Sequence, residues 1–329
     1  MAKVATEFGR RRAPLVPPLH QPGVRAGSPD TMPKGLFIRL LILLAVAAGC
    51  GQGAGVDGLQ VLRHTREIVR HGPHPPGSEA QRKAGEYIAG QLGALGLQVD
   101  THTFRSVTPR GRLRMANVRG ILPGRDERVL ILASHYDSKF YDTFEFVGAN
   151  DGASTSGLVL ELARVLVEKN STGLTLWFVF FDGEEAVGET WTSADSLYGS
   201  REFVKREKAR GNLRKIGAMI LLDLVGGKDL RLFREGYSTP WLNEIIWDQA
   251  SRLGHERIFR PSGRGSHIED DHLPFLRAGV PAVDLIDLSY AHWHKPSDTL
   301  DKLSAPNLEV VGEVVLASLP EIARRVKRK

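Results

Sequence analysis

The chain has 329 residues, of which 42% are hydrophobic and 25% are charged, a balance typical of a soluble globular protein with enough apolar residues for a full core. Its formal net charge of +6 does not indicate nucleic-acid binding, because residues 1–49 contain seven Lys or Arg against two Asp or Glu and so carry +5 of it. Cys50 is the single cysteine, which excludes an internal disulfide and a cysteine zinc site, so any metal must bind His and carboxylate side chains.

The N-terminal region has the composition of a targeting segment. Residues 1–31 are rich in Pro and Arg and are predicted to be a disordered leader, or to lie upstream of the true start. Residues 32–50 combine a short basic region with the apolar run LLILLAVAA, which is typical of a secretory signal and short for a membrane span. Small residues before Cys50 also resemble a bacterial lipoprotein signal, in which Cys50 would be lipidated. The alternatives are an ordinary cleaved signal and an uncleaved N-terminal anchor.

We therefore expect an exported protein, periplasmic or at the cell surface, that meets a membrane only through its N-terminal anchor. Residues 51–55 are predicted to be a linker, and residues 56–329 a single catalytic domain.

The remaining chain first predicts two helices and three strands, then an alternation of strands and helices. Ser78 and Gly96 have the residue types of an N-cap and a helix stop around the second helix. In chain order, helices are predicted at 56–72, 79–95, 153–168, 200–209, 240–253, within 268–278 and at 307–324, and strands at 97–104, 115–122, 128–134, 174–181, 216–222 and 282–286. The alternation predicts an α/β domain with a mixed, mostly parallel central sheet, covered by helices on both faces and with antiparallel edge strands within 97–122.

The stretch 174–186, LTLWFVFFDGEEA, is the strongest indication of a functional site. Its apolar run predicts a buried central strand, and Glu184 and Glu185 follow directly at the carboxyl end. A carboxylate near a core needs a partner, and a metal ion is a strong candidate. The alternative interpretation of this segment is a solvated turn with two surface glutamates.

Other acidic or imidazole residues follow predicted strands or lie in the loops after them. They are His135 and Asp137 in HYD, Asp151 in GANDGA, Asp223 after AMILL, and His294 in AHWHK. Each alone is weak evidence, since a single His or Asp after a strand is often solvated. Together they indicate a site, because parallel strands bring their carboxyl ends to one edge of the sheet.

This ordered set resembles the zinc-dependent aminopeptidases of peptidase family M28 over roughly residues 56–329. Within that family the chain is most similar to the glutaminyl cyclases, on the segments HYDSK at 135–139, FFDGEEA at 180–186, DSLYGSR at 195–201, LLDL at 221–224, IEDDHLPF at 268–275 and the pair Trp293-His294.

The resemblance implies a set of roles. Asp151, Glu185 and His294 would ligate one Zn²⁺ and leave a fourth position open, as a catalytic zinc requires. Glu184 would be the proton shuttle. The remaining implied roles are a hydrogen-bonded carboxylate pair of Asp223 and Asp270, substrate-pocket walls from Trp191 and Trp293, and a position beside the ligands, or at a second metal, for His135 and Asp137.

The expected reaction is the cyclisation of N-terminal glutamine in a peptide to pyroglutamate, with release of ammonia. The principal alternative is a two-zinc aminopeptidase, in which His135 and Asp223 would hold a second ion and Asp151 would bridge. A non-catalytic, surface-anchored binding module is the third possibility, and its signature would be a damaged ligand set. Trp191 and Trp293 could also be ordinary core aromatics.

Overall fold

The computed structural model describes residues 55–169 and 173–327 of the chain. The predictions for the leader, the signal segment, Cys50 and most of the linker lie outside these residues. Among the helices of the described part, none combines the length and the apolar character that crossing a membrane requires.

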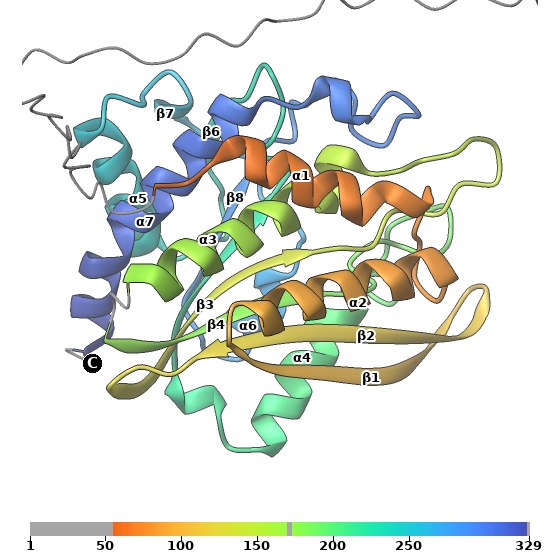
Figure 1. Ribbon diagram of the computed structural model, residues 1–329, viewed down its shortest axis with the longest axis horizontal. Helices are drawn as coiled ribbons and strands as arrows, with labels where there is room; N and C mark the ends of the chain where they lie inside the picture. The colour runs from red at the N-terminus through yellow and green to blue at the C-terminus, as the bar shows by residue number, and fades with distance from the viewer. Residues whose placement is uncertain (1–54, 170–172, 328–329) are drawn as a thin grey trace, which may run out of the picture. The chain divides into compact units, whose positions relative to one another are not determined.

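A six-stranded mixed sheet forms the centre of the domain, with strand order β1-β2-β4-β3-β5-β8 (Figure 1). Strands β4, β3, β5 and β8 run parallel, whereas β1 pairs with β2, and β2 with β4, in antiparallel register. The bounds are β1 Gln98–Thr108, β2 Gly111–Leu122, β3 Asp126–His135, β4 Leu174–Phe181, β5 Ile216–Asp223 and β8 Ala282–Ile286. The predicted sheet and its antiparallel edge are confirmed.

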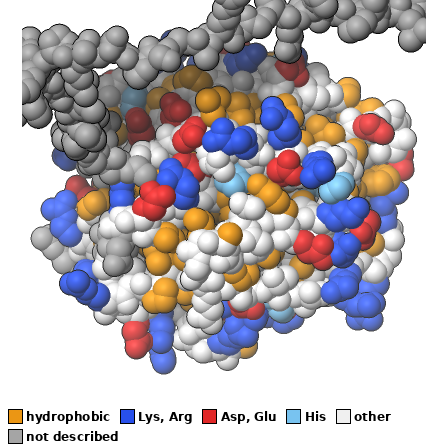
Figure 2. All heavy atoms as spheres, viewed as in Figure 1, with side chains coloured by type: hydrophobic (Ala, Val, Ile, Leu, Met, Phe, Trp, Pro, Cys, Tyr) orange, Lys and Arg blue, Asp and Glu red, His pale blue; other side chains and the backbone are white. Residues whose placement is uncertain are grey.

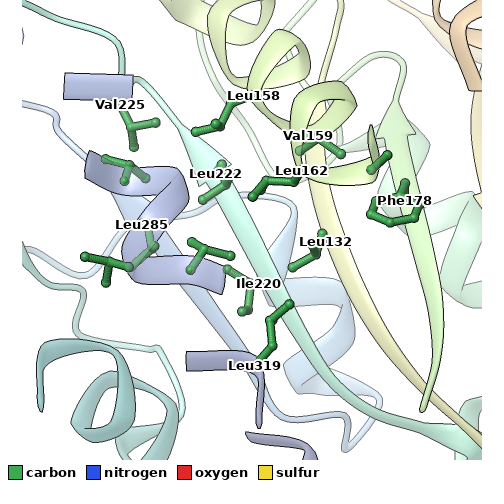
Figure 3. Close-up of a cluster of buried hydrophobic side chains, with 14 of the residues drawn as sticks. Leu132, Leu158, Val159, Leu162, Phe178, Ile220, Leu222, Val225, Leu285 and Leu319 are labelled. Atoms are coloured by element: carbon green, nitrogen blue, oxygen red, sulfur yellow. The ribbon is translucent and has the colours of Figure 1, made fainter. Parts of the chain in front are cut away.

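Helices cover both faces of the sheet, as the alternation predicted. One face packs against helices α1 Gly58–Ile68, α2 Glu79–Ala94, α3 Thr155–Lys169, α5 Pro240–Arg252 and α7 Ala305–Lys327. The opposite face packs against α4 Tyr198–Ala209 and α6 His272–Arg277. On the first face, Leu132 and Phe178 of the strands contact the apolar side of α3 at Val159 and Leu162 (Figure 3).

Local sequence signals fix the ends of α2 within one residue of where they were expected, whereas the predicted ends of α1, α3, α4 and α7 differ by up to four residues. The Ser78 side chain accepts a hydrogen bond from the backbone N–H of Gln81 at 3.0 Å and so caps α2. Gly96 follows this helix with a φ of +76°, a conformation that glycine adopts without strain.

The structure also contains elements that the sequence did not indicate. Strands β6 Leu232–Arg234 and β7 Phe259–Arg264 form a small separate sheet. Each has only a few residues, and β7 carries Pro261 and Gly263, so neither shows an apolar alternation. Residues Ala149–Ser154 form a kinked, wide turn before α3, with non-helical backbone angles at Asp151 and Gly152.

Charges of both signs are interspersed on the surface of the domain. On the face shown in Figure 2, Lys and Arg side chains lie among Asp and Glu side chains.

Candidate active site

The carboxyl ends of the parallel strands bring the predicted residues together. Strand β3 ends at His135, β4 ends just before the segment that carries Glu184, and β5 ends at Asp223. Because these three strands lie next to one another and point the same way, their last residues meet at one edge of the sheet.

Asp151, Glu185 and His294 converge as predicted, although they are far apart in the sequence. Each offers one ligand atom to a group whose members all lie within 4.8 Å of one another. His294 Nε2 is 3.1 Å from Glu185 Oε1 and 3.5 Å from Asp151 Oδ2. Asp151 Oδ2 and Glu185 Oε2 are buried and have no hydrogen-bond partner. Because buried carboxylate oxygens normally have a partner, this group suits a metal ion.

The turn before α3 holds Asp151 by its backbone. The N–H groups of Asn150 and Asp151 donate to the two oxygens of Asp298, at 2.9 and 3.1 Å. The Tyr290 hydroxyl donates to Asp298 as well, at 2.8 Å. Asp298 therefore links the Asp151 turn to the loop that carries His294.

Asp137 holds the segment after β4 in the same way. Its two carboxylate oxygens accept the backbone N–H groups of Glu184 at 3.1 Å and Glu185 at 3.2 Å. Lys139 Nζ donates to the carbonyl of Ala186 at 3.0 Å and lies 3.7 Å from Glu185 Oε2. The peptide that carries both glutamates is thus fixed from β3 and the residues after it.

His294 has an uncommon backbone conformation for its residue type. Its φ is +53°, in the left-handed region, and the other non-glycine residues with positive φ in the described chain are Leu197 and Leu224, the latter next to Asp223. Such strain is most often found where a side chain must be aimed. The His294 ring stacks on Trp293 with ring centroids 4.4 Å apart and meets the edge of Phe146.

His135 lies between several carboxylates. Its Nε2 is 3.3 Å from both Asp151 Oδ1 and Asp223 Oδ1, and its Nδ1 is 3.6 Å from Asp137 Oδ1. Burial lowers the pKa of His135, but its close contacts with the carboxylates of Asp137, Asp151 and Asp223 outweigh this effect and leave the pKa well above its ordinary value. His135, Asp151 and Asp223 form a second group with the spacing of metal ligands, which shares Asp151 with the first.

Asp270 belongs to a buried group with His272 and Asp284. The resemblance implied a role for Asp270 but none for Asp284. Burial, with the charge of Asp223, raises the pKa of Asp270 to about 6. Burial and the charge of Asp270 raise the pKa of Asp284 well above its ordinary value. Asp223 and Asp270 line the same cavity, while their direct pairing stays a prediction. A signal for Asp284 was present, since it interrupts the apolar strand segment AVDLI.

Asp151, Glu185, His294, Asp223 and Asp270 line a cavity of about 450 Å³. Glu184 lines it and is 6% exposed, and burial raises the pKa of Glu184 well above its ordinary value against the opposing effect of His135. Trp191 and Trp293 also line the cavity and give it aromatic walls. Trp293 is 40% exposed and Trp191 is not among the buried hydrophobic residues, so neither belongs to the apolar core.

Known proteins resemble this chain in sequence and in fold. The family model described as peptidase family M28 matches residues 117–319. The glutaminyl-peptide cyclotransferase of Drosophila melanogaster is 34% identical over 253 residues, covering 69% of this chain and 71% of that protein. The glutaminyl-peptide cyclotransferase of Bos taurus is 32% identical over 338 residues, covering 90% of this chain and 92% of that protein.

Two solved structures show the same fold. A glutaminyl cyclase from an Acidobacteriales bacterium superimposes with a TM-score of 0.77 at 35% identity, covering 85% of this chain and 99% of that one. A leucine aminopeptidase precursor from Bacteroides thetaiotaomicron superimposes with a TM-score of 0.75 at 27% identity, covering 82% of this chain and 98% of that one.

Proposed function

The chain belongs to peptidase family M28, and on that basis we propose that it is a zinc-dependent glutaminyl-peptide cyclotransferase. Its substrates are peptides or proteins with N-terminal glutamine. The α-amine attacks the side-chain γ-amide carbonyl, a five-membered lactam forms, the bond to the amide nitrogen breaks, and ammonia leaves.

The observation that carries this proposal is the placement of Glu184 beside an intact ligand group in a Trp-lined cavity. The unpartnered oxygens of Asp151 and Glu185, with His294, give the two carboxylates and one imidazole that a catalytic zinc uses. When bound there, zinc supplies Lewis-acid polarisation of a carbonyl oxygen.

Glu184 is the proposed proton carrier. In its ionised form it accepts the proton that the α-amine loses as the lactam closes, and it then delivers that proton to the departing ammonia. Its neighbour in sequence, Glu185, would hold the metal. Both backbone N–H groups are bound to Asp137, so the two carboxylates keep a fixed relation.

Asp270 and Asp223 supply further hydrogen-bonding groups in the cavity. With a pKa of about 6, Asp270 exchanges its proton near neutral pH and can stabilise the nitrogen of the tetrahedral intermediate. Trp191 and Trp293 give the cavity an apolar, aromatic wall. A bound substrate that displaced water from this wall would favour cyclisation, because hydrolysis of the amide is the competing reaction.

A two-zinc aminopeptidase is the second candidate, and the group of His135, Asp151 and Asp223 favours it. In that enzyme Asp151 would bridge two ions and Glu184 would activate water. The leucine aminopeptidase precursor among the structural relatives shares the fold. We propose one zinc, and the metal content per chain separates the two candidates.

Purified protein incubated with Gln-initiated and Leu-initiated reporter peptides provides the test. Cyclisation predicts ammonia release from the Gln peptide without peptide-bond cleavage, lost with a chelator and lowered about 10²- to 10⁴-fold in Glu184→Gln. Elemental analysis should give one zinc per chain. Free leucine from the Leu peptide, with two zinc ions per chain, would establish the aminopeptidase instead.

We also propose that the chain is exported and lipidated on Cys50, which would make the N-terminal anchor its membrane contact. The support is the signal-like sequence of residues 32–50. Mass spectrometry of membrane-extracted protein should show a processed N-terminus at a modified Cys50. In Cys50→Ser the modification should vanish and the protein should move to the soluble fraction.

A further inference from the structure

The mouth of the active-site cavity combines an aromatic side chain with two acidic ones. Glu189, Trp191 and Glu269 all line the cavity, and both glutamates are exposed. The indole Nε1 of Trp191 lies 3.4 Å from Glu269 Oε2 and donates to it. This contact joins the loop after β4 to the loop before α6 in one wall, which we call the acidic wall.

Among the residues that the structure describes, no free Lys or Arg side chain lines the same cavity to balance these charges. Among its lining residues the only Lys or Arg is Lys139, and that side chain is 5% exposed. Its ammonium group is already bound to the carbonyl of Ala186 and lies near Glu185. His267 is the remaining basic residue near the mouth and is exposed.

The direction of a bound peptide follows from the two ends of the cavity. Buried oxygens without partners, on Asp151, Glu185 and Asp270, mark the reactive end, where the glutamine side chain must be held. The rest of the peptide must therefore leave through the mouth. The residue after the glutamine is the first to pass the acidic wall.

We propose that the acidic wall selects substrates in which the glutamine is followed by Arg or Lys. This inference rests on the proposed cyclisation. A guanidinium or ammonium group can lie on the face of Trp191 and pair with Glu189 or Glu269, which adds a cation–π contact to an ion pair. Arg is favoured over Lys, because its planar group both stacks on an aromatic ring and pairs with a carboxylate.

The test compares the dipeptide amides Gln-Arg and Gln-citrulline, which differ in charge but hardly in shape. Because the contact is made equally in the ground state and the transition state, the effect belongs in KM with kcat unchanged. The KM for Gln-Arg should be lower by about three- to tenfold, the range of exposed ion pairs acting together. The difference should shrink in about 1 M salt, where exposed charges are screened.

Charge-neutral variants identify the residues. In Glu189→Gln together with Glu269→Gln, the ratio of the two KM values should fall to about one. Glu244→Gln removes one negative charge from an exposed position on α5 that does not line the cavity, and should leave the ratio unchanged. A general folding defect lowers turnover of both peptides, so the ratio isolates the recognition of charge.

The possible failures are distinct. Equal KM values for the two peptides in the unmodified protein, or an unchanged ratio in the double variant, would overturn the proposed selectivity and leave cyclisation standing. If neither peptide is cyclised, the proposed function itself is wrong.

Discussion

Asp137 and Glu184 are joined by a hydrogen bond in which the backbone N–H of Glu184 donates to Asp137 Oδ1 at 3.1 Å. The second oxygen of Asp137 accepts the next N–H, that of Glu185. A single buried carboxylate therefore fixes the peptide unit between the proposed proton carrier and a proposed zinc ligand. Residues that hold metal ligands in this way affect metal affinity without touching the ion.

Asp137→Ala should lower zinc affinity and kcat by about 10- to 100-fold each, because both N–H groups lose their acceptor. Asp137→Asn retains one acceptor oxygen and should lose less. Zinc affinity is measured by competition with a chromogenic chelator, and kcat by ammonia release. Equal affinity in all three proteins would show that Asp137 does not hold the segment.

Gly152→Ala should destabilise the fold by about 1–3 kcal/mol, the cost of backbone strain at such a position. The φ of Gly152 is +88°, and an added Cβ would lie 2.6 Å from His135 Cε1 and 3.1 Å from the carbonyl oxygen of Asp137. Gly90→Ala is the matched control, since Gly90 lies in α2 and a Cβ there meets nothing within 4 Å. That change should stabilise by up to about 1 kcal/mol. Urea denaturation measures both, and equal effects would contradict the prediction.

Asp298→Asn should lower zinc affinity by about tenfold. Each oxygen of Asp298 accepts one backbone N–H group, from Asn150 or Asp151, and the amide of Asn would leave one of these donors without an acceptor. Tyr290→Phe removes only the third donor to Asp298 and should have a smaller effect. The same chelator competition measures both variants. A larger loss in Tyr290→Phe than in Asp298→Asn would contradict this order.

Glu235 should make the stability of the fold depend on acidic pH. Burial raises its pKa, but the close contact with His272, whose Nε2 lies 3.3 Å from Glu235 Oε2, and hydrogen bonds from the backbone N–H groups of Tyr237 and Ile268 lower it to about 2. Because the folded-state pKa lies below the unfolded one, Glu235 stabilises the fold fully above pH 4.5, its ordinary pKa, and this contribution is lost as the pH falls toward 2.

Glu235→Gln should therefore cost about 1.5–3 kcal/mol at neutral pH, the range for hydrogen bonds to a charged group. The difference from the unmodified protein should narrow steadily as the pH falls below 4.5. Urea denaturation of zinc-free protein at several pH values measures it and keeps metal loss out of the comparison. A difference independent of pH would mean that the Glu235 charge does not contribute.

Much of the fold could be predicted from local pattern. The apolar run of β4 and the alternation of strands and helices were sufficient for the sheet and for helices on both faces. The short strands β6 and β7 were missed, because three to six residues without apolar alternation carry no periodic signal. The sequence placed Asp151 in a loop before a helix but did not predict the kinked shape of that turn, whose backbone N–H groups bind Asp298, 147 residues further along the chain.

The sequence by itself determined which residue types could bind a metal and that they would gather at one edge of the sheet, because strands that alternate with helices run parallel and end at the same edge. Only the tertiary structure decided which of these carboxylates share an ion and which hold the backbone in place. It brought His294 Nε2 to 3.1 Å from Glu185 Oε1, 109 residues away in the sequence. It also placed Asp284 next to Asp270, and Asp298 where it accepts the backbone N–H of Asp151. Such distances depend on how loops pack against the finished sheet, and no local pattern in the chain encodes that packing.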